Sequence, residues 1–197
     1  MGLAPVSPND VATIVTTLEM RAKPPLRPLP DSQLRLVAWD RPTLDKYRAL
    51  FRRVGEPWLW FSRLVMEDER LAAIIHDPDI AIFAVVDQQG IEVGMLELDF
   101  RESAQCELSY FGLIPELAGH GHGRWLMANA LQHAWRPGID RVWVHTCTLD
   151  HRRALGFYRA SGFTAIARTV ETFADPRVTG ILSADTAPHV PLLASRR

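Results

Sequence analysis

Alternating glycines at Gly119, Gly121 and Gly123 mark the stretch of this chain whose residue types and spacing most directly suggest chemistry. The stretch, completed by His120 and His122, follows an expected strand and opens an expected helix. Glycine lets a backbone turn tightly and approach a ligand closely. The free N–H groups at a helix start favour an anion such as a phosphate or pyrophosphate. The alternative is a glycine-rich turn without a ligand, because short motifs are weak signals.

The spacing of the glycines argues against two common phosphate-binding loops. G-x-G-x-G departs from the dinucleotide motif G-x-G-x-x-G, and no Lys follows as a G-x-x-x-x-G-K-[ST] loop requires. Arg124, in the first turn of the expected helix, is able to add a charge-assisted contact.

A second motif lies downstream, where Asp150-His151-Arg152-Arg153-Ala154 leads to Tyr158 and then to Gly162-Phe163. Together with P-E-x-x-G-x-G-x-G at 115–123, it resembles the acyl-CoA loop and the N-x-x-A-x-x-x-Y-x-x-x-G-F segment of the GNAT (GCN5-related) N-acetyltransferase superfamily. The resemblance covers about residues 80–170, and more loosely 33–77. Ala118 departs from the family's usual Gln or Arg, and His151 replaces its usual Asn.

This resemblance implies transfer of an acetyl group from acetyl-CoA, as cosubstrate, to a primary amine by direct attack. The pyrophosphate would sit on residues 119–124. Tyr158 would be the general acid for the leaving thiolate. The remaining cofactor-binding residues that the resemblance implies are Phe111, Gly112, Leu113, Ile114, His151 and Ala154.

The base that accepts the amine proton is sought on the strand before the glycine loop. Glu107 stands there among apolar neighbours, where some family members place a base-like Glu, and it could act through a water. A solvent-facing carboxylate is the alternative, and Glu97 on the neighbouring strand is a weaker candidate. Period two places Glu107, Ser109 and Phe111 on one face of the strand, and Gly112 fits a β-bulge.

An aromatic-rich segment suggests an acceptor site. Trp58, Phe61 and Val65 recur at the spacing of one helix face, which predicts a helix there. In the family that this chain resembles, the first helices and their connection line the acceptor pocket, so the resemblance implies that Trp58, Trp60 and Arg63 shape it, with Arg63 gripping a carboxylate. A core helix with an exposed Arg explains the same residues.

Histidines and cysteines invite two further hypotheses. His120-x-His122 lacks a carboxylate or Cys at ligand spacing, so we predict no metal. Cys147 stands two residues from His145 and could be a nucleophile, but a buried structural thiol is commoner.

Hydrophobic periodicity predicts the scaffold that positions these residues. Strands, helices and turns predict a mixed α/β (α+β) layered domain. The resemblance implies that this domain has the GNAT acyl-CoA N-acyltransferase fold, a mixed and mostly antiparallel sheet flanked by helices, with an extra N-terminal strand. Asp150 is expected to cap the last helix and Gly162 to follow its end. We divide the chain into an N-terminal strand and Pro-rich linker (1–32), an acetyltransferase domain (33–175) and an irregular tail (176–197).

Composition limits the partners. The 197 residues include 22 Lys and Arg against 23 Asp and Glu, which leaves no basic footprint for nucleic acid or a membrane surface. The chain has 2 cysteines and lacks a secretory leader or a bilayer-spanning run, so we expect a cytoplasmic protein.

The resemblance implies an amine acceptor, for which we favour a small molecule; the evenly spread charges do not choose among amino acids, polyamines, antibiotics and protein termini. The extra N-terminal strand could pair across a homodimer. The alternatives are a non-catalytic acyl-CoA-binding or regulatory module, and a mononucleotide- or metal-binding protein.

Overall fold

Seven strands form one mixed sheet in the computed structural model, which describes residues 2–25 and 28–193. The sheet order is β2-β3-β4-β5-β6-β1-β7. The strands are β1 (Asp10–Met20), β2 (Arg35–Trp39), β3 (Ile80–Val86), β4 (Glu92–Asp99), β5 (Gln105–Leu113), β6 (Arg141–Cys147) and β7 (Thr164–Ala174). The helices are α1 (Leu44–Gly55), α2 (Asp68–Ile75), α3 (His122–Ala134) and α4 (Ala154–Ala160), with short 3-10 turns η1 (Glu56–Trp58) and η2 (Pro115–Leu117).

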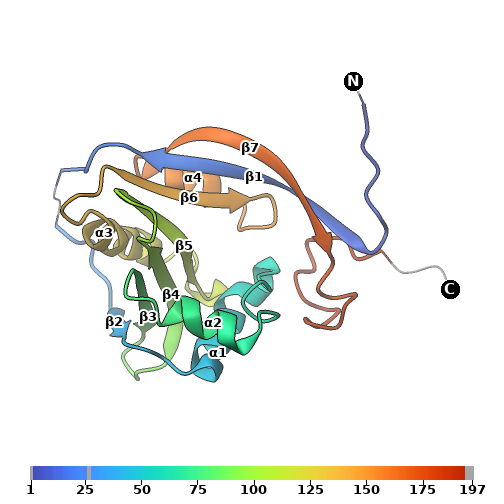
Figure 1. Cartoon of the computed structure of the whole chain (residues 1–197), viewed down its shortest axis with the longest axis horizontal. Helices are drawn as coiled ribbons and strands as arrows, with labels where there is room; N and C mark the ends of the chain where they lie inside the picture. Colours follow the sequence, from blue (N-terminus) through green and yellow to red (C-terminus); the bar gives the residue numbers. More distant parts are fainter. Residues whose placement is uncertain (1, 26–27, 194–197) are drawn as a thin grey trace.

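Two helical layers cover opposite faces of this sheet (Figure 1). On one face α1 and α2 bury an apolar stripe that includes Tyr47, Phe51 and Leu71. On the other face α3 and α4 pack against a second core, to which Leu126 and Tyr158 belong. The predicted fold class, a mixed and mostly antiparallel sheet flanked by helices, is confirmed.

The segment after α1 does not continue as the predicted helix through Trp58 and Val65. Thr43 caps α1 by accepting from the Lys46 N–H, and the helix ends at Gly55. A single 3-10 turn follows, and Leu59 then takes a positive φ of 59°. Because that left-handed backbone cannot propagate a right-handed helix, residues 59–66 fold as an irregular loop. We call it the acceptor-side loop.

The sequence suggested a β-bulge at Gly112, but the bulge of β5 lies at Ser109. Leu108 pairs with Leu98 and Tyr110 with Glu97, so Ser109 is the extra residue. The extra residue reverses the faces of the strand beyond it. Phe111 therefore joins the core under α3, on the face opposite Glu107, and the prediction that they share a face is wrong.

Gly112 is needed for a different reason, because it lies in regular register opposite Met95. A Cβ atom there would lie 2.8 Å from Val54 Cγ1 on α1 and 3.3 Å from the Trp60 ring. The absence of a side chain at Gly112 lets α1 and the acceptor-side loop pack directly onto β5.

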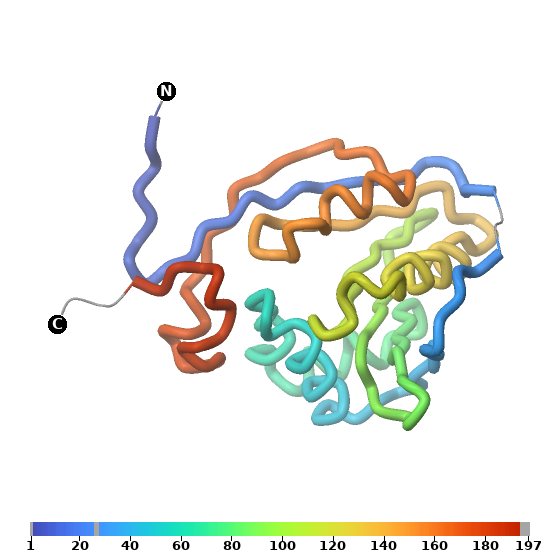
Figure 2. The backbone as a smooth tube through the Cα atoms, turned by 180° about the vertical axis from the view of Figure 1, so that it is seen from behind, coloured from blue at the N-terminus to red at the C-terminus, as the bar shows by residue number. Residues whose placement is uncertain are grey.

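The extra N-terminal strand, β1, is built into the interior of the sheet. It runs antiparallel between β6 and β7, so that Thr17 stands opposite both His145 and Ala167. Figure 2 shows this pair of strands, β1 and β7, arching past the end of β6 as a long ribbon. The predicted boundary at residue 32 thus cuts one continuous sheet. Residues 1, 26–27 and 194–197 of the predicted terminal segments lie outside the described residues.

The segment after β7 has no helix or strand through residue 193, yet it is packed. The buried Arg177 side chain donates to Asp175 and to the carbonyl oxygen of Val190 at 2.8 Å. Thr186 Oγ1 donates to Glu56 Oε1 at 3.1 Å. These contacts hold the tail against η1 and join the far end of the β1–β7 ribbon to the α1 side of the molecule.

Candidate active site

A fork between β5 and β6 is the centre of the candidate site. The two strands run parallel and pair from Gln105 and Arg141 as far as Leu108 and Val144, then part. A cavity of about 990 Å³ opens beyond that point. It is lined by residues 108–115, 117–119, 123, 144–147, 150–154, 157 and 158, together with 15, 58, 60 and 169–171.

The glycine loop forms one end of this cavity. Gly119 and Gly123 are in the lining, and the positive φ values of Gly119 (87°) and Gly121 (84°) turn the chain into α3. In the first turn of α3 the Arg124 N–H donates to the Gly121 carbonyl oxygen at 3.0 Å, whereas the N–H groups of His122 and Gly123 have no carbonyl one turn earlier in the helix. The loop therefore offers backbone donors at the helix start, as the sequence indicated.

The side chains of this loop are not directed uniformly toward the cavity. His122 Nδ1 lies 2.9 Å from Ser32 Oγ, in the segment before β2. His120, Gly121, His122 and Arg124 are not among the lining residues, and the Arg124 guanidinium approaches the position of a Gly121 Cβ at 3.8 Å. The structure thus brings Gly119 and Gly123 to the cavity, and places the other predicted loop residues beside it.

The remaining predicted cofactor residues lie on the walls of the cavity. Residues 111–114 continue β5 beyond its last pairing with β6, so one edge of their backbone faces the fork. The other predicted residues in the lining are His151, Ala154 and Tyr158.

The turn before α4 differs from the sequence prediction. Asp150 does not cap the helix, and its Oδ2 instead accepts from Thr146 Oγ1 at 2.8 Å and from the Cys147 N–H at 2.9 Å. The helix starts only at Ala154, so His151 lies in the preceding turn and not on the helical face of Tyr158. Gly162 follows the helix end with a φ of 102°, as predicted.

Tyr158 is buried, with 7% of its surface exposed, although it forms part of the cavity wall. Its ring packs against Phe111 and Phe163 at centroid distances of 6.1 and 6.0 Å. Burial, with a smaller contribution from the charge of Asp150, raises the pKa of Tyr158 well above its ordinary value. The phenol therefore keeps its proton at neutral pH.

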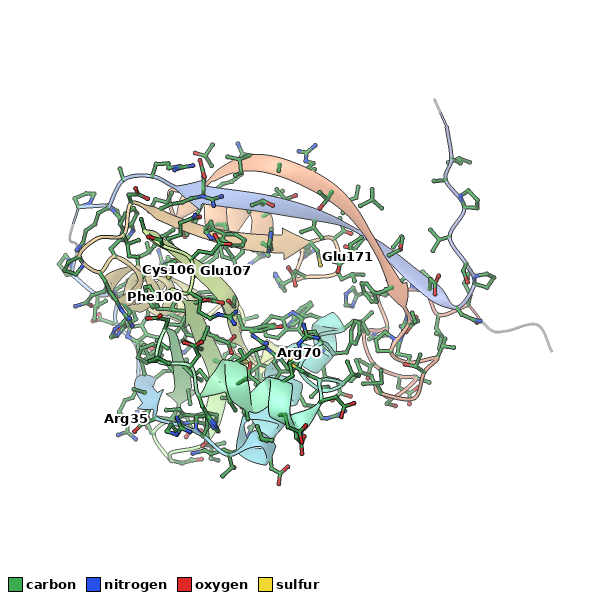
Figure 3. The ribbon with its side chains drawn as sticks, viewed as in Figure 1. Arg35, Arg70, Phe100, Cys106, Glu107 and Glu171 are labelled. Carbon is green, nitrogen blue, oxygen red and sulfur yellow. The ribbon has the colours of Figure 1, made fainter. Side chains whose placement is uncertain are left out.

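Glu107 projects from β5 on the opposite face of the sheet, the face covered by α1 (Figure 3). Glu107 Oε1 lies 3.6 Å from His145 Nδ1 on β6, and the side chains are 27% and 47% exposed. His145 belongs to the cavity lining and Glu107 does not. The predicted base thus lies outside the cavity lining, next to a histidine that belongs to it.

Aromatic side chains form the acceptor-side wall. The Trp58 ring lies between the rings of His151 and His189, at 5.6 and 5.8 Å. Trp60 packs against Tyr110 at 5.2 Å. Both tryptophans line the cavity, although they stand on a 3-10 turn and a loop and not on the expected helix.

Arg63 lies behind this wall, outside the cavity lining. It is buried, and its Nη2 donates to Glu97 Oε1 at 2.7 Å. Tyr47 donates its hydroxyl to Glu97 Oε2 at 2.5 Å. The carboxylate that Arg63 grips is therefore one of this chain, and Glu97, the weaker candidate base, is fully engaged.

The structure bears on two hypotheses from the sequence, a nucleophilic Cys147 and a metal site at His120 and His122. Burial raises the pKa of Cys147, so its thiol is not prepared as a nucleophile at neutral pH. Among residues 2–25 and 28–193, no group of three or more His, Cys, Asp or Glu is placed to hold a metal ion. No helix of the described residues is long and apolar enough to cross a bilayer.

Sequence reasoning missed the residues that β1 and β7 bring to the cavity, namely Val15, Thr169, Val170 and Glu171. Nothing local indicates that these strands flank the fork, because their pairing is long-range. It also left His145 without a role beside Glu107. The sequence does indicate the face of the strand on which His145 lies, because Trp143 and His145 alternate with apolar Val142 and Val144 on one expected strand.

Comparisons with known proteins agree with this geometry. Residues 38–163 match the family model described as the acetyltransferase (GNAT) family. A mycothiol acetyltransferase of Beutenbergia cavernae is 30% identical over 115 residues, which cover 58% of this chain and 33% of that protein. The chain thus spans about a third of the length of this curated relative.

Solved structures share the fold at lower identity. An aminoglycoside acetyltransferase from an uncultured soil metagenomic sample, in complex with sisomicin, superposes with a TM-score of 0.56 at 19% identity, over 71% of this chain and 93% of that one. The spermidine N-acetyltransferase of Vibrio cholerae superposes with a TM-score of 0.53 at 21% identity, over 76% and 98%.

Proposed function

Since the chain belongs to the acetyltransferase (GNAT) family and is an acyltransferase, we propose that it transfers an acetyl group from acetyl-CoA to the primary amine of a small molecule. The fork between β5 and β6 is the observation that carries this proposal. Beyond Leu108 and Val144 the facing backbone edges of the two strands no longer pair with each other. An extended chain bearing amide groups, such as a pantetheine arm, finds unpaired donors and acceptors there.

The residues around the fork fit such a donor. Gly119 and Gly123 place helix-start N–H groups at one end of the cavity, where a diphosphate would be stabilised. His151, Ala154 and residues 111–114 supply the walls between that end and Tyr158. Arg124, Gly121, His120 and His122 stay proposed contacts of the outer part of the diphosphate site.

Acetyl-CoA supplies a thioester whose carbonyl carbon accepts the amine. The amine nitrogen forms a bond to that carbon, and the carbon–sulfur bond breaks as the sulfur leaves with the electron pair. Tyr158, held protonated by burial, gives its proton to the leaving thiolate. One proton of the amine leaves to a base on the acceptor side, where the predicted base Glu107 lies beside His145.

The acceptor is proposed to enter on the α1 face, past Trp58 and Trp60. The solved relatives' names point to acceptors with several amines, spermidine and aminoglycosides. The lining of the same cavity includes Glu171 on β7, and Glu107 lies beside His145. Aromatic rings and carboxylates together suit a cationic amine.

Release of free CoA thiol from acetyl-CoA, measured with a panel of primary amines, tests the proposal. We expect amine-dependent release by the wild-type chain, and loss of at least about 10²-fold in kcat for Tyr158→Phe with acetyl-CoA binding retained. Tight acetyl-CoA binding without transfer to any amine would favour the non-catalytic acyl-CoA-binding module. Failure to bind acetyl-CoA at all would refute both.

A further inference from the structure

His145 occupies a particular place in the fork. It directly follows Val144, the last residue of β6 that pairs with β5. Val142 and Val144 point into the core under α3, so the side chain of His145 lies on the opposite face, with that of Glu107. His145 lines the cavity at the level where the two strands part, whereas Glu107 lies behind it.

The imidazole of His145 is held between two neighbours. Its Nδ1 lies 3.6 Å from Glu107 Oε1, and its ring and the Trp143 ring are T-shaped, at a centroid distance of 4.8 Å and an interplanar angle of 83°. Within the part of the chain that the structure describes, Nε2 makes no hydrogen bond. With Nδ1 directed at the carboxylate, Nε2 is the ring nitrogen left to serve the cavity.

We propose that His145 is the general base of the transfer and that Glu107 is a positioning residue that acts through it. This inference rests on the proposed function and assigns the proton acceptor within it. As the amine nitrogen bonds to the acetyl carbon, Nε2 takes one amine proton. The Nδ1–H then points at the Glu107 carboxylate, which holds the neutral ring in the tautomer with Nε2 unprotonated and stabilises the imidazolium that forms.

The arrangement of acid and base across the sheet supports this assignment. Tyr158 reaches the cavity from the α4 side of the sheet, and His145 reaches it from the α1 side. The fork is the opening between the two faces. The thioester therefore receives the amine from one face, and its sulfur leaves toward the proton donor on the other.

Glu107 is less suited to touch the amine itself. Its side chain is the less exposed of the pair, at 27% against 47%, and it is absent from the cavity lining. A base must lie within hydrogen-bond reach of the proton that it removes. The acceptor side of the cavity meets His145 before it meets the carboxylate.

Kinetics of matched variants test the proposal. We expect His145→Gln to lower kcat/KM for the amine by about 10²-fold or more, with acetyl-CoA affinity unchanged, and Glu107→Gln to lower it by about 10-fold. His133→Gln, on α3 beside Phe83 and outside the cavity, is the control and should retain wild-type rates. Imidazole added to His145→Ala should restore part of the rate, which a purely structural role would not allow.

A spectroscopic readout tests the pair without any acceptor. Nitrogen NMR of the histidine rings should show the Nδ1–H tautomer for neutral His145 in the wild-type chain and a shift toward the Nε2–H tautomer in Glu107→Gln. Wild-type rates in His145→Gln, or an Nε2–H tautomer in the wild type, would overturn the assignment and leave acetyl transfer itself standing. Absence of transfer by the wild-type chain would overturn both.

Discussion

Replacing Glu97 by glutamine should destabilise the fold strongly, because Glu97 is the buried counter-ion of Arg63. Glu97 has no exposed surface, and the Arg63 side chain is 9% exposed, so solvent cannot take over the charge. Removing one partner of a buried ion pair costs about 3–5 kcal/mol, most of it from the charge left unpaired. Since single domains unfold with about 5–15 kcal/mol, this is a large share of the total.

Urea unfolding at neutral pH measures this loss. Glu92→Gln is the matched control, because Glu92 pairs with Lys46 at 3.7 Å between side chains that are both well exposed. Such a surface pair contributes about 0–1 kcal/mol. The double variant Arg63→Met with Glu97→Gln should lose less than Glu97→Gln alone, because it leaves no unpaired charge in the interior.

The same variants bear on the acceptor side of the cavity. Arg63 anchors the acceptor-side loop to β4, so we expect faster amide hydrogen exchange in that loop for Glu97→Gln than for the wild-type chain. A loss below about 1 kcal/mol for Glu97→Gln, equal to that of the surface control, would refute the reasoning. So would a double variant less stable than the single one.

Three further outcomes are expected. Gly112→Ala should cost about 1–3 kcal/mol in urea unfolding, because the added carbon would lie 2.8 Å from Val54 Cγ1. Because burial raises the pKa of Tyr158, ionisation of this phenol should not lower kcat below about pH 10. A fall of kcat below that pH in the wild-type chain that is absent in Tyr158→Phe would contradict this expectation. Burial opposes ionisation of Asp175, but the hydrogen bonds from Arg177 outweigh it and lower the pKa of this carboxyl. The stabilising effect of the ionised Asp175 is therefore complete above the ordinary Asp pKa and is lost as pH falls below about 4. In Asp175→Asn the free energy of unfolding should depend less on pH below about 4.

Local signals predicted much of the scaffold. The period-two patterns matched β3 to β6, and the glycine loop opened α3 as expected, because these features depend on neighbours in sequence. The helix through Trp58 and Val65 failed for a reason that spacing does not reveal, the left-handed backbone of Leu59. The apolar spacing did not mark one buried helix face, since Trp58 and Phe61 are half-buried and Val65 is 48% exposed.

The site was predictable where a motif spans it and not where the sheet assembles it. Motif spacing singled out Tyr158, His151 and Gly119, and all three line the cavity. The bulge at Ser109 did not, because it depends on the register between β4 and β5, and it decides which residues share the face of Glu107. The proximity of Glu107 to His145 likewise depends on the parallel pairing of β5 with β6, two strands that α3 separates in the sequence.

The position of β1 has a consequence for the order in which the molecule is assembled. This strand leaves the ribosome before the other six strands of the sheet, but its two neighbours are β6 and β7, and Thr13 bonds with Thr148 across 135 residues of sequence. Contacts of such long range raise contact order and slow folding. A chain still in synthesis holds β1 unpaired until β6 and β7 emerge, so we expect completion of the fork to be among the last events of folding.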